Sequence, residues 1–159
     1  MTFNIREATE LDVPLILQFI RDLAEYEKLA HLVVATEATL RDTLFGGTPF
    51  AEVLIAEEEG AAAGFALFFH NYSTFLAQPG IYLEDLFVKP EYRGRGYGKT
   101  LLVRLAQIAR ERNCGRVEWA VLDWNEPSIA FYKSLGARVM DEWHTFRLTG
   151  EALEKLAGR

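Results

Sequence analysis

The residues with the clearest chemistry lie in the stretch RGRGYGKT, which begins at Arg93 and ends at Thr100. Three alternating glycines allow a backbone to come close to a ligand, and two arginines and a lysine add positive charge. A phosphate group suits such a loop, because the free N–H groups at the start of a helix can bind its oxygens. The stretch could therefore hold a nucleoside triphosphate, a dinucleotide or coenzyme A.

The spacing of the glycines separates these three ligands. The Walker A pattern G-x-x-x-x-G-K-[ST] matches the ending GKT, but Arg93 stands at its first glycine position. The dinucleotide pattern G-x-G-x-x-G is missed by one residue, since Gly94, Gly96 and Gly98 alternate. The pattern R-x-x-G-x-G fits and predicts a loop that binds a pyrophosphate. The alternative is a glycine-rich turn whose arginines only keep the surface soluble.

The distribution of charge supports a phosphate partner for this segment. From Lys89 to Arg104 there are five basic residues against Glu91 alone, a net charge of +4, whereas the whole chain carries −6. The rest of the chain is therefore near −10. Such an acidic balance argues against general binding to nucleic acid or to an anionic membrane, and it favours a small cationic partner.

The hydrophobic pattern predicts a mixed α/β fold with a largely antiparallel first half and a βαβ-like second half. Strands are expected at 3–8, 80–90, 115–122 and 142–148, with a hairpin at 51–72 whose Glu57, Glu58 and Glu59 would be turn and edge charges. Helices are expected at 13–29, 36–46, 98–113, 127–137 and 149–157. Thr9 and Asp12 would cap the first helix, and Leu101, Leu105 and Ile108 would face inward.

The composition predicts one cytoplasmic domain. At 159 residues the chain is long enough for one core, and its N-terminus has no apolar signal segment. Cys114 is the sole cysteine, which excludes a disulfide. A buried thiol is the favoured interpretation of Cys114, and a covalent acyl-cysteine is the alternative, although no histidine is near it in sequence. His31, His70 and His144 lack metal-ligand spacing, so no metal site is expected.

Two longer stretches carry a family resemblance. YLEDLFVKPEYRGRGYG and, after one helix and strand, LDWNEPSIAFYKSLGA resemble the GNAT superfamily of N-acetyltransferases. Within it the chain is similar to the diamine (spermidine/spermine) and thialysine acetyltransferases, from IREAT to WHTFRL. The resemblance implies a GNAT fold, with a twisted, mostly antiparallel sheet of about seven strands and flanking helices, in a single domain over 1–159. It also implies acetyl-CoA as donor and a homodimer.

The resemblance assigns the coenzyme site to two segments. The pantetheine arm would pair with the backbone of the strand before the loop, and the glycine loop would hold the pyrophosphate. Asn125 and Ser128 would contact the coenzyme at the start of a later helix, where Asn125 could equally be a helix cap. The residues implied are Leu86, Phe87, Val88, Arg93, Gly94, Arg95, Gly96, Tyr97, Gly98, Lys99, Asn125 and Ser128.

The resemblance also assigns two catalytic residues. Glu84 would remove a proton from the amine, directly or through water, and Tyr132 would protonate the departing thiolate. The alternative for Tyr132 is a core residue on an amphipathic helix. One of Glu84 and Asp85 should face water or substrate, because burying an unpaired charge is costly. The alternative for Asp85 is a structural hydrogen bond or ion pair.

The acceptor site implied by the resemblance is acidic and aromatic. Its residues would be Tyr26, Glu27, Glu84, Asp85, Glu118, Trp119 and Glu142. Thr74 and Leu76 stand where the animal diamine enzymes carry an acidic residue and a tryptophan, so the pattern leans toward the thialysine type. The expected activity is transfer of an acetyl group from acetyl-CoA to a small primary amine in a ternary complex. A regulatory acyl-CoA-binding module, a protein-lysine acetyltransferase and a P-loop hydrolase are the alternatives.

Overall fold

The structure, a computed structural model, describes residues 2–158. The chain divides into two compact units, Met1–Ala120 and Val121–Arg159. The first unit contains the whole sheet and three of the α-helices. The second contains α4 (Glu126–Ser134) and α5 (Gly150–Ala157), as the sequence predicted for both helices.

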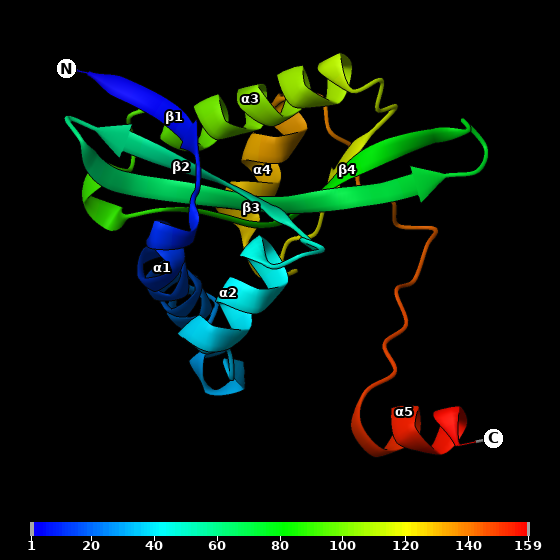
Figure 1. The fold of residues 1–159 in the computed structure, drawn as a ribbon. Coiled ribbons are helices and arrows are strands. Elements are labelled where there is room, and N and C mark those ends of the chain that lie inside the picture. The colour runs from blue at the N-terminus through cyan, green and yellow to red at the C-terminus, as the bar shows by residue number, and fades with distance from the viewer. Residues whose placement is uncertain (1, 159) are drawn as a thin grey trace. The chain divides into compact units, whose positions relative to one another are not determined.

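The first unit is built on one twisted sheet of five strands in the order β1-β2-β3-β4-β5 (Figure 1). The strands are β1 (Phe3–Glu7), β2 (Glu52–Glu58), β3 (Ala61–Ser73), β4 (Gln78–Val88) and β5 (Val117–Trp119). Neighbours pair antiparallel except β4 and β5, which are parallel and joined through a helix. The expected hairpin and the βαβ-like second half are both confirmed.

The prediction of about seven strands is wrong by two for the described part of the chain, although the fold class holds. The strand expected at 115–122 extends only over Val117–Trp119, and the segment 142–148 is irregular. A strand needs a neighbour for its N–H and C=O groups, and sequence pattern alone does not supply one. In this structure 142–148 pairs with no strand within residues 2–158.

Local capping defines where the helices of the first unit begin. Before α1 (Val13–Tyr26), the Thr9 N–H donates to Asp12 Oδ2 at 2.8 Å, and a 3₁₀ turn (Glu10–Asp12) leads into the helix. At the start of α2 (Glu37–Phe45), the Thr39 N–H donates to Thr36 Oγ1 at 3.1 Å. Two further 3₁₀ turns, Ala30–Leu32 and Pro90–Tyr92, precede α2 and α3 (Tyr97–Glu111). These boundaries agree with the predicted helices.

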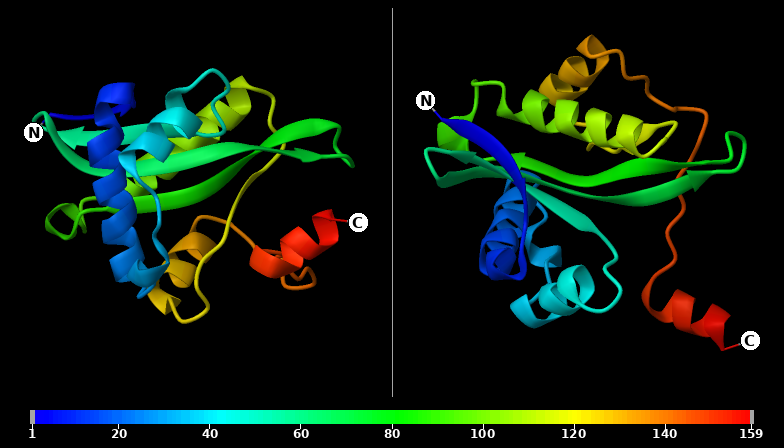
Figure 2. Two further views of the ribbon diagram at one scale, coloured as in Figure 1. Left: turned by 60° about the horizontal axis from the view of Figure 1, so that its bottom comes forward. Right: turned by 45° about the horizontal axis from the view of Figure 1, so that its top comes forward.

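Helices cover both faces of this sheet: α1 and α2 lie on one face and α3 on the other (Figures 1 and 2). Under α1, the rings of Phe19 and Phe65 stack with centroids 5.0 Å apart in the main apolar cluster. Under α3, Leu101, Leu105 and Ile108 are buried as predicted. Both layers hold β4 between them, and β4 carries the residues from which the site is built.

Candidate active site

The glycine loop forms a turn at the start of α3, which we call the cradle, with its backbone N–H groups as the candidate donors to a ligand. Gly94 and Gly96 have φ of 78° and 81°, the left-handed region that favours glycine, and Gly96 is the residue that precedes α3. The first N–H to bond within α3 belongs to Thr100, which donates to the Gly96 carbonyl at 2.9 Å. The N–H groups before it receive no side-chain cap within residues 2–158. They are therefore available to an anion at the positive end of the helix.

The cradle is open to a ligand at Gly98. A Cβ built on Gly98 would have one neighbour within 4 Å among the described atoms, Val88 Cγ2 at 4.0 Å. The described chain therefore leaves the Cβ position of Gly98 open. A pyrophosphate fits such a turn because backbone donors can approach it closely.

The arginines of the loop have partners within the protein. Arg93 Nε donates to the Val88 carbonyl at 2.9 Å, and its guanidinium lies 5.1 Å from the Tyr26 ring and 5.4 Å from the Phe87 ring. Arg95 NH1 lies 2.8 Å from both carboxylate oxygens of Glu58. Both arginine side chains are nevertheless exposed. A phosphate role for Arg93, Arg95 and Lys99 stays a prediction.

Glu58 corrects the expectation that residues 57–59 are turn and edge charges. Its side chain is buried, with 8% of the residue exposed, and accepts hydrogen bonds from Arg95 and from the Tyr97 hydroxyl. These two donors lower the pKa of Glu58, the Tyr97 hydroxyl contributing most. The alternation of side chains along a strand could have predicted this burial. Glu58 lies on the same face of β2 as Leu54 and Ala56, and both of these residues are buried.

The strand that leads to the loop has a free edge. Among the described residues, β4 pairs with β5 from Ile81 to Leu83, and Leu83 is the residue opposite Trp119. From Glu84 to Val88 the edge of β4 facing away from β3 has no strand partner within the described chain. Its backbone groups can therefore pair with an extended ligand. This segment contains Leu86, Phe87 and Val88, the residues predicted to hold the pantetheine arm.

A β-bulge lies at the start of the free edge. Leu83 pairs with Phe68 and Asp85 pairs with Leu67, so Glu84 is the extra residue of β4. Bulges redirect side chains and occur often beside active sites. Glu84 is exposed and Asp85 is partly buried. The prediction that one of the two carboxylates faces the solvent side is confirmed.

Asp85 belongs to a cluster of acidic residues. Burial, together with the charges of Glu84 and Glu27, raises the pKa of Asp85 to about 6. Burial and the charge of Glu84 also raise the pKa of Glu27, which follows the last residue of α1. The Asp85 carboxylate makes no ion pair within residues 2–158. The role of Asp85, in substrate contact or in a structural hydrogen bond or ion pair, stays a prediction.

The cluster extends across the sheet to β5. Glu118 lies opposite Tyr82, and burial together with the charges of Glu84 and Glu118 raises the pKa of the Tyr82 phenol. Glu118 accepts a hydrogen bond from Asn71 Nδ2 at 3.1 Å. Of the predicted acceptor residues, Glu27, Glu84, Asp85 and Glu118 thus contribute to one negative region. Such a region attracts a cation.

Four predicted residues belong to the second unit. The Ser128 N–H donates to Asn125 Oδ1 at 3.4 Å, so Asn125 caps α4. Tyr132 lies in that helix, and Glu142 lies in the irregular segment after it. The helix-cap role of Asn125 is confirmed. The roles of all four toward coenzyme or substrate stay predictions.

The histidine absent from the sequence neighbourhood of Cys114 is supplied by β3. Cys114 Sγ lies 3.9 Å from His70 Nδ1. However, His70 Nδ1 also lies 3.0 Å from the Gly80 carbonyl, which can only accept, and Nε2 lies 3.0 Å from Arg112 NH1, which can only donate. These contacts place the proton on Nδ1, so His70 cannot take a proton from Cys114 at that atom. The pair does not form a thiolate nucleophile in this arrangement.

Comparisons with known proteins agree with this geometry. The family model described as "Acetyltransferase (GNAT) family" matches residues 18–137. The chain belongs to the GNAT acetyltransferase family. It is 45% identical to the thialysine N-epsilon-acetyltransferase of Bos taurus, over 98% of this chain and 97% of that protein. It is 37% identical to the L-ornithine N5-acetyltransferase of Arabidopsis thaliana, over 98% and 88%.

A solved structure shares the fold. An integron cassette protein from V. cholerae superposes with a TM-score of 0.83 at 30% identity, covering 100% of this chain and 99% of that one. The chain is therefore an acyl-CoA-dependent N-acetyltransferase, and the predicted P-loop alternative is excluded. No helix among the described residues has the length and apolar character needed to span a bilayer.

Proposed function

We propose that this enzyme transfers an acetyl group from acetyl-CoA to a primary amine of a small cationic acceptor, by direct attack in a ternary complex. One observation carries the proposal: an acidic cluster lies at the bulge where the free edge of β4 begins. The free edge leads directly to the α3 cradle. An amine-binding region and a coenzyme-binding region are thus adjacent on one strand.

Three features of the chain suit acetyl-CoA, which supplies an activated acyl group and a thiolate leaving group. Free N–H groups at the start of α3 suit the pyrophosphate, together with Gly94, Gly96 and Gly98. The edge of β4 from Leu86 to Val88 can pair with the amides of the pantetheine arm. A backbone N–H of this edge would stabilise the negative charge that develops on the thioester oxygen.

The proton transfers are assigned to Glu84 and Tyr132. An aliphatic amine is protonated near neutral pH and must lose a proton before it can attack. Glu84 is exposed at the bulge and surrounded by other acids, so it would attract the ammonium and take its proton, directly or through water. Tyr132 would donate its phenolic proton to the sulfur as the carbon–sulfur bond breaks. Asn125 and Ser128 would assist in binding the coenzyme.

The acceptor is proposed to be a diamine, a polyamine or a thialysine-like compound. Glu27, Asp85 and Glu118 supply negative charge for a cationic group, and Tyr26, Trp119 and Glu142 would complete the site. The names of the two relatives place acetylation on an amine distant from the carboxylate, N-epsilon in one and N5 in the other. A thialysine-like acceptor is therefore the first compound to test.

The test is an acetylation assay with acetyl-CoA against diamines, polyamines, thialysine, ornithine and lysine-containing peptides, with the product measured by mass. Turnover of a small amine at a higher kcat/KM than any peptide is expected. Preference for the peptides would overturn the small-molecule assignment in favour of protein lysines. The absence of turnover with every amine, combined with tight acetyl-CoA binding, would favour a regulatory module.

The role of Tyr132 is tested with Tyr132→Phe. General acid catalysis contributes roughly 10²–10⁴ in rate, so kcat should fall by about 100-fold or more while the Kd for acetyl-CoA changes less than about twofold. Tyr72→Phe is a matched control, because Tyr72 is a 65% exposed tyrosine on β3. An undiminished kcat for Tyr132→Phe would remove Tyr132 from the mechanism.

We further propose one cytoplasmic homodimer of single-domain chains. The family match runs from residue 18 to residue 137 and so continues across both units, which supports one domain over 1–159. Sedimentation equilibrium tests the dimer: a monomer at micromolar concentration would contradict it. No nucleic acid, membrane or metal partner is part of this proposal.

A further inference from the structure

An ion pair between the buried Glu58 carboxylate and the exposed Arg95 lies beside the phosphate cradle, at the start of α3. We propose that Glu58 is a positioning residue for the coenzyme, because it holds Arg95 and Tyr97 and so sets the geometry of the backbone donors at the start of α3. This inference rests on the proposed function of the loop as the pyrophosphate site. It concerns a residue outside the sites proposed for the coenzyme and the amine.

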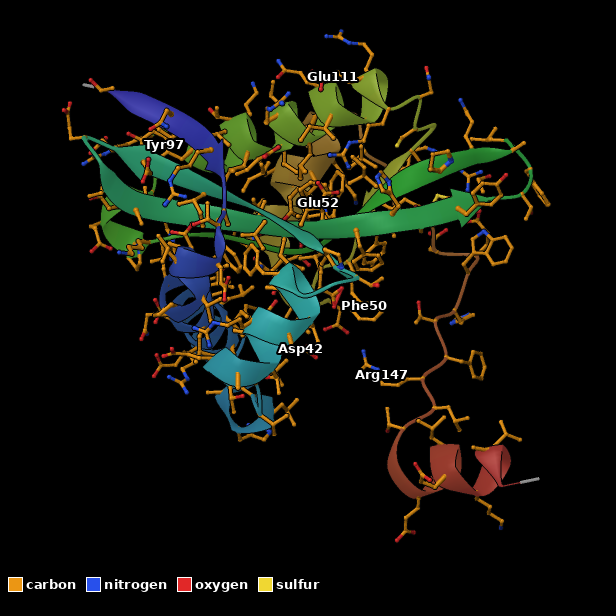
Figure 3. All side chains as sticks on the ribbon, in the orientation of Figure 1. Asp42, Phe50, Glu52, Tyr97, Glu111 and Arg147 are labelled. Atoms are coloured by element: carbon orange, nitrogen blue, oxygen red, sulfur yellow. The ribbon has the colours of Figure 1, made fainter. Side chains whose placement is uncertain are left out.

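The contacts of Glu58 converge on the loop from the end of β2. Its carboxylate accepts from Arg95 NH1 at 2.8 Å through each oxygen and from the Tyr97 hydroxyl. The ring of Tyr97 is stacked on Phe3 of β1, with centroids 4.3 Å apart and planes 13° apart. Figure 3 shows Tyr97 at the end of the sheet where β1 and the β2–β3 turn lie. The first residue of α3 is thereby attached to two strands.

A second attachment holds the other end of the loop to the same hairpin. The Lys89 N–H donates to the Ala63 carbonyl at 2.8 Å, and Ala63 is the bulged residue of β3, since Ala56 pairs with Gly64 and Glu57 with Ala62. The segment from Lys89 to Tyr97 is therefore fixed to the β2–β3 hairpin at both ends. The hydrogen bonds of Glu58 to Arg95 and Tyr97 are the contacts that hold the half of the loop containing Gly94 and Gly96.

Fixing this half matters because glycine gives the loop many alternative conformations. Gly94 and Gly96 can adopt positive or negative φ at little cost, so an unattached loop would lose considerable conformational entropy on binding a pyrophosphate. Glu58 reduces this loss by ordering the residues between and after the two glycines. Its contacts therefore favour coenzyme binding without adding any contact to the coenzyme.

The same contacts give Arg95 a role different from phosphate binding. Its charge is compensated by Glu58, and its guanidinium lies 5.5 Å from the Tyr92 ring. If Arg95 instead bound phosphate, removal of Glu58 would release it and strengthen coenzyme binding. The two models thus predict opposite signs for the same substitution.

The experiment measures KM for acetyl-CoA and for S-acetylpantetheine, which lacks the phosphates, in the full-length enzyme and in Glu58→Leu. Charge-assisted hydrogen bonds of this kind are strong enough that we expect KM for acetyl-CoA to rise about tenfold. KM for S-acetylpantetheine and KM for the amine should change less than about twofold, since neither ligand uses the cradle. Glu58→Gln retains an acceptor oxygen and should recover part of the affinity for acetyl-CoA.

Glu57→Leu is the matched control, because Glu57 is the adjacent β2 carboxylate and pairs with Arg6 at 3.1 Å rather than with the loop. It should leave KM for acetyl-CoA unchanged. If Glu58→Leu does not fold, Tyr97→Phe removes one of the bonds while keeping the stacked ring, and about a threefold rise in the same KM is expected.

Each remaining outcome is decisive. An unchanged or lower KM for acetyl-CoA in Glu58→Leu, or in Tyr97→Phe when that variant replaces it, overturns the positioning role. Equal rises in KM for both thioesters would show a general structural effect and also overturn it. If the unmodified enzyme itself fails to distinguish acetyl-CoA from S-acetylpantetheine, the loop is not a pyrophosphate site, and the proposed coenzyme function fails instead.

Discussion

Asp85→Asn should stabilise the protein at neutral pH, against the usual effect of replacing a partly buried polar residue. The pKa of Asp85 is raised from 3.8 to about 6 by burial and by the charges of Glu84 and Glu27. Ionised Asp85 therefore opposes folding. One pKa unit corresponds to about 1.4 kcal/mol, so a shift of roughly two units costs about 3 kcal/mol once the carboxylate is ionised in both states.

The sign of the pH dependence follows from this shift. With its folded pKa raised, Asp85 contributes stability that is fully present below the unfolded pKa of 3.8 and is lost as the pH rises through about 6. Asparagine does not titrate and shows no such loss. The stability gained by Asp85→Asn should therefore grow from about 0.5 kcal/mol near pH 4 to about 1–3 kcal/mol near pH 7.5.

Urea unfolding of both proteins across this pH range is the assay. Asp12→Asn is a control of opposite sign, because the hydrogen bond from Arg6, above all, lowers the pKa of Asp12. Asp12 contributes stability above its unfolded pKa that is lost at acid pH, so Asp12→Asn should destabilise most near neutral pH. If Asp85→Asn also destabilised the protein more near pH 7.5 than near pH 4, a cation would have to compensate Asp85. The account of the acidic cluster would then be wrong.

Three further predictions concern the amine, the coenzyme and the fold. A bound ammonium lowers the pKa of Asp85, so KM for the amine should fall as the pH rises from about 5 to about 7. This fall in KM should be absent in Asp85→Asn. The same dependence of KM on pH in both proteins would contradict a role for Asp85 in binding the amine. Gly98→Ala should raise Tm slightly or leave it unchanged, because Val88 Cγ2 is the one described atom within 4 Å of the new Cβ, yet it should raise KM for acetyl-CoA. An unchanged KM would mean that the ligand does not approach there. Gly64→Ala should lower stability by about 1–3 kcal/mol in urea unfolding, since its Cβ would lie 2.5 Å from the Phe87 carbonyl oxygen; equal stability would disprove this close approach.

The site was predictable where the chemistry is local. A glycine pattern before a helix predicts free N–H groups whatever the rest of the chain does, and Gly96 does precede α3. Threonine caps and helical spacing likewise placed α1, α2 and the buried face of α3, because those signals act within a few residues. The acidic pair at 84–85 was also visible, and its solvent-facing member was expected from the cost of burying charge.

The features of the site that the sequence did not predict depend on which strands and turns come together in the fold. Glu58 became a buried anchor only because Arg95 and Tyr97, far along the chain, are brought to the end of β2. The raised pKa of Asp85 comes from burial first and then from the charges of Glu84 and of Glu27, which follows α1. The segment 142–148 has strand-like residues but pairs with no strand in the part of the chain that the structure describes. Local sequence determined the helix ends and the glycine turn before α3. Tertiary structure decided strand pairing and the environment of each carboxylate, because pairing and burial depend on residues distant in the chain.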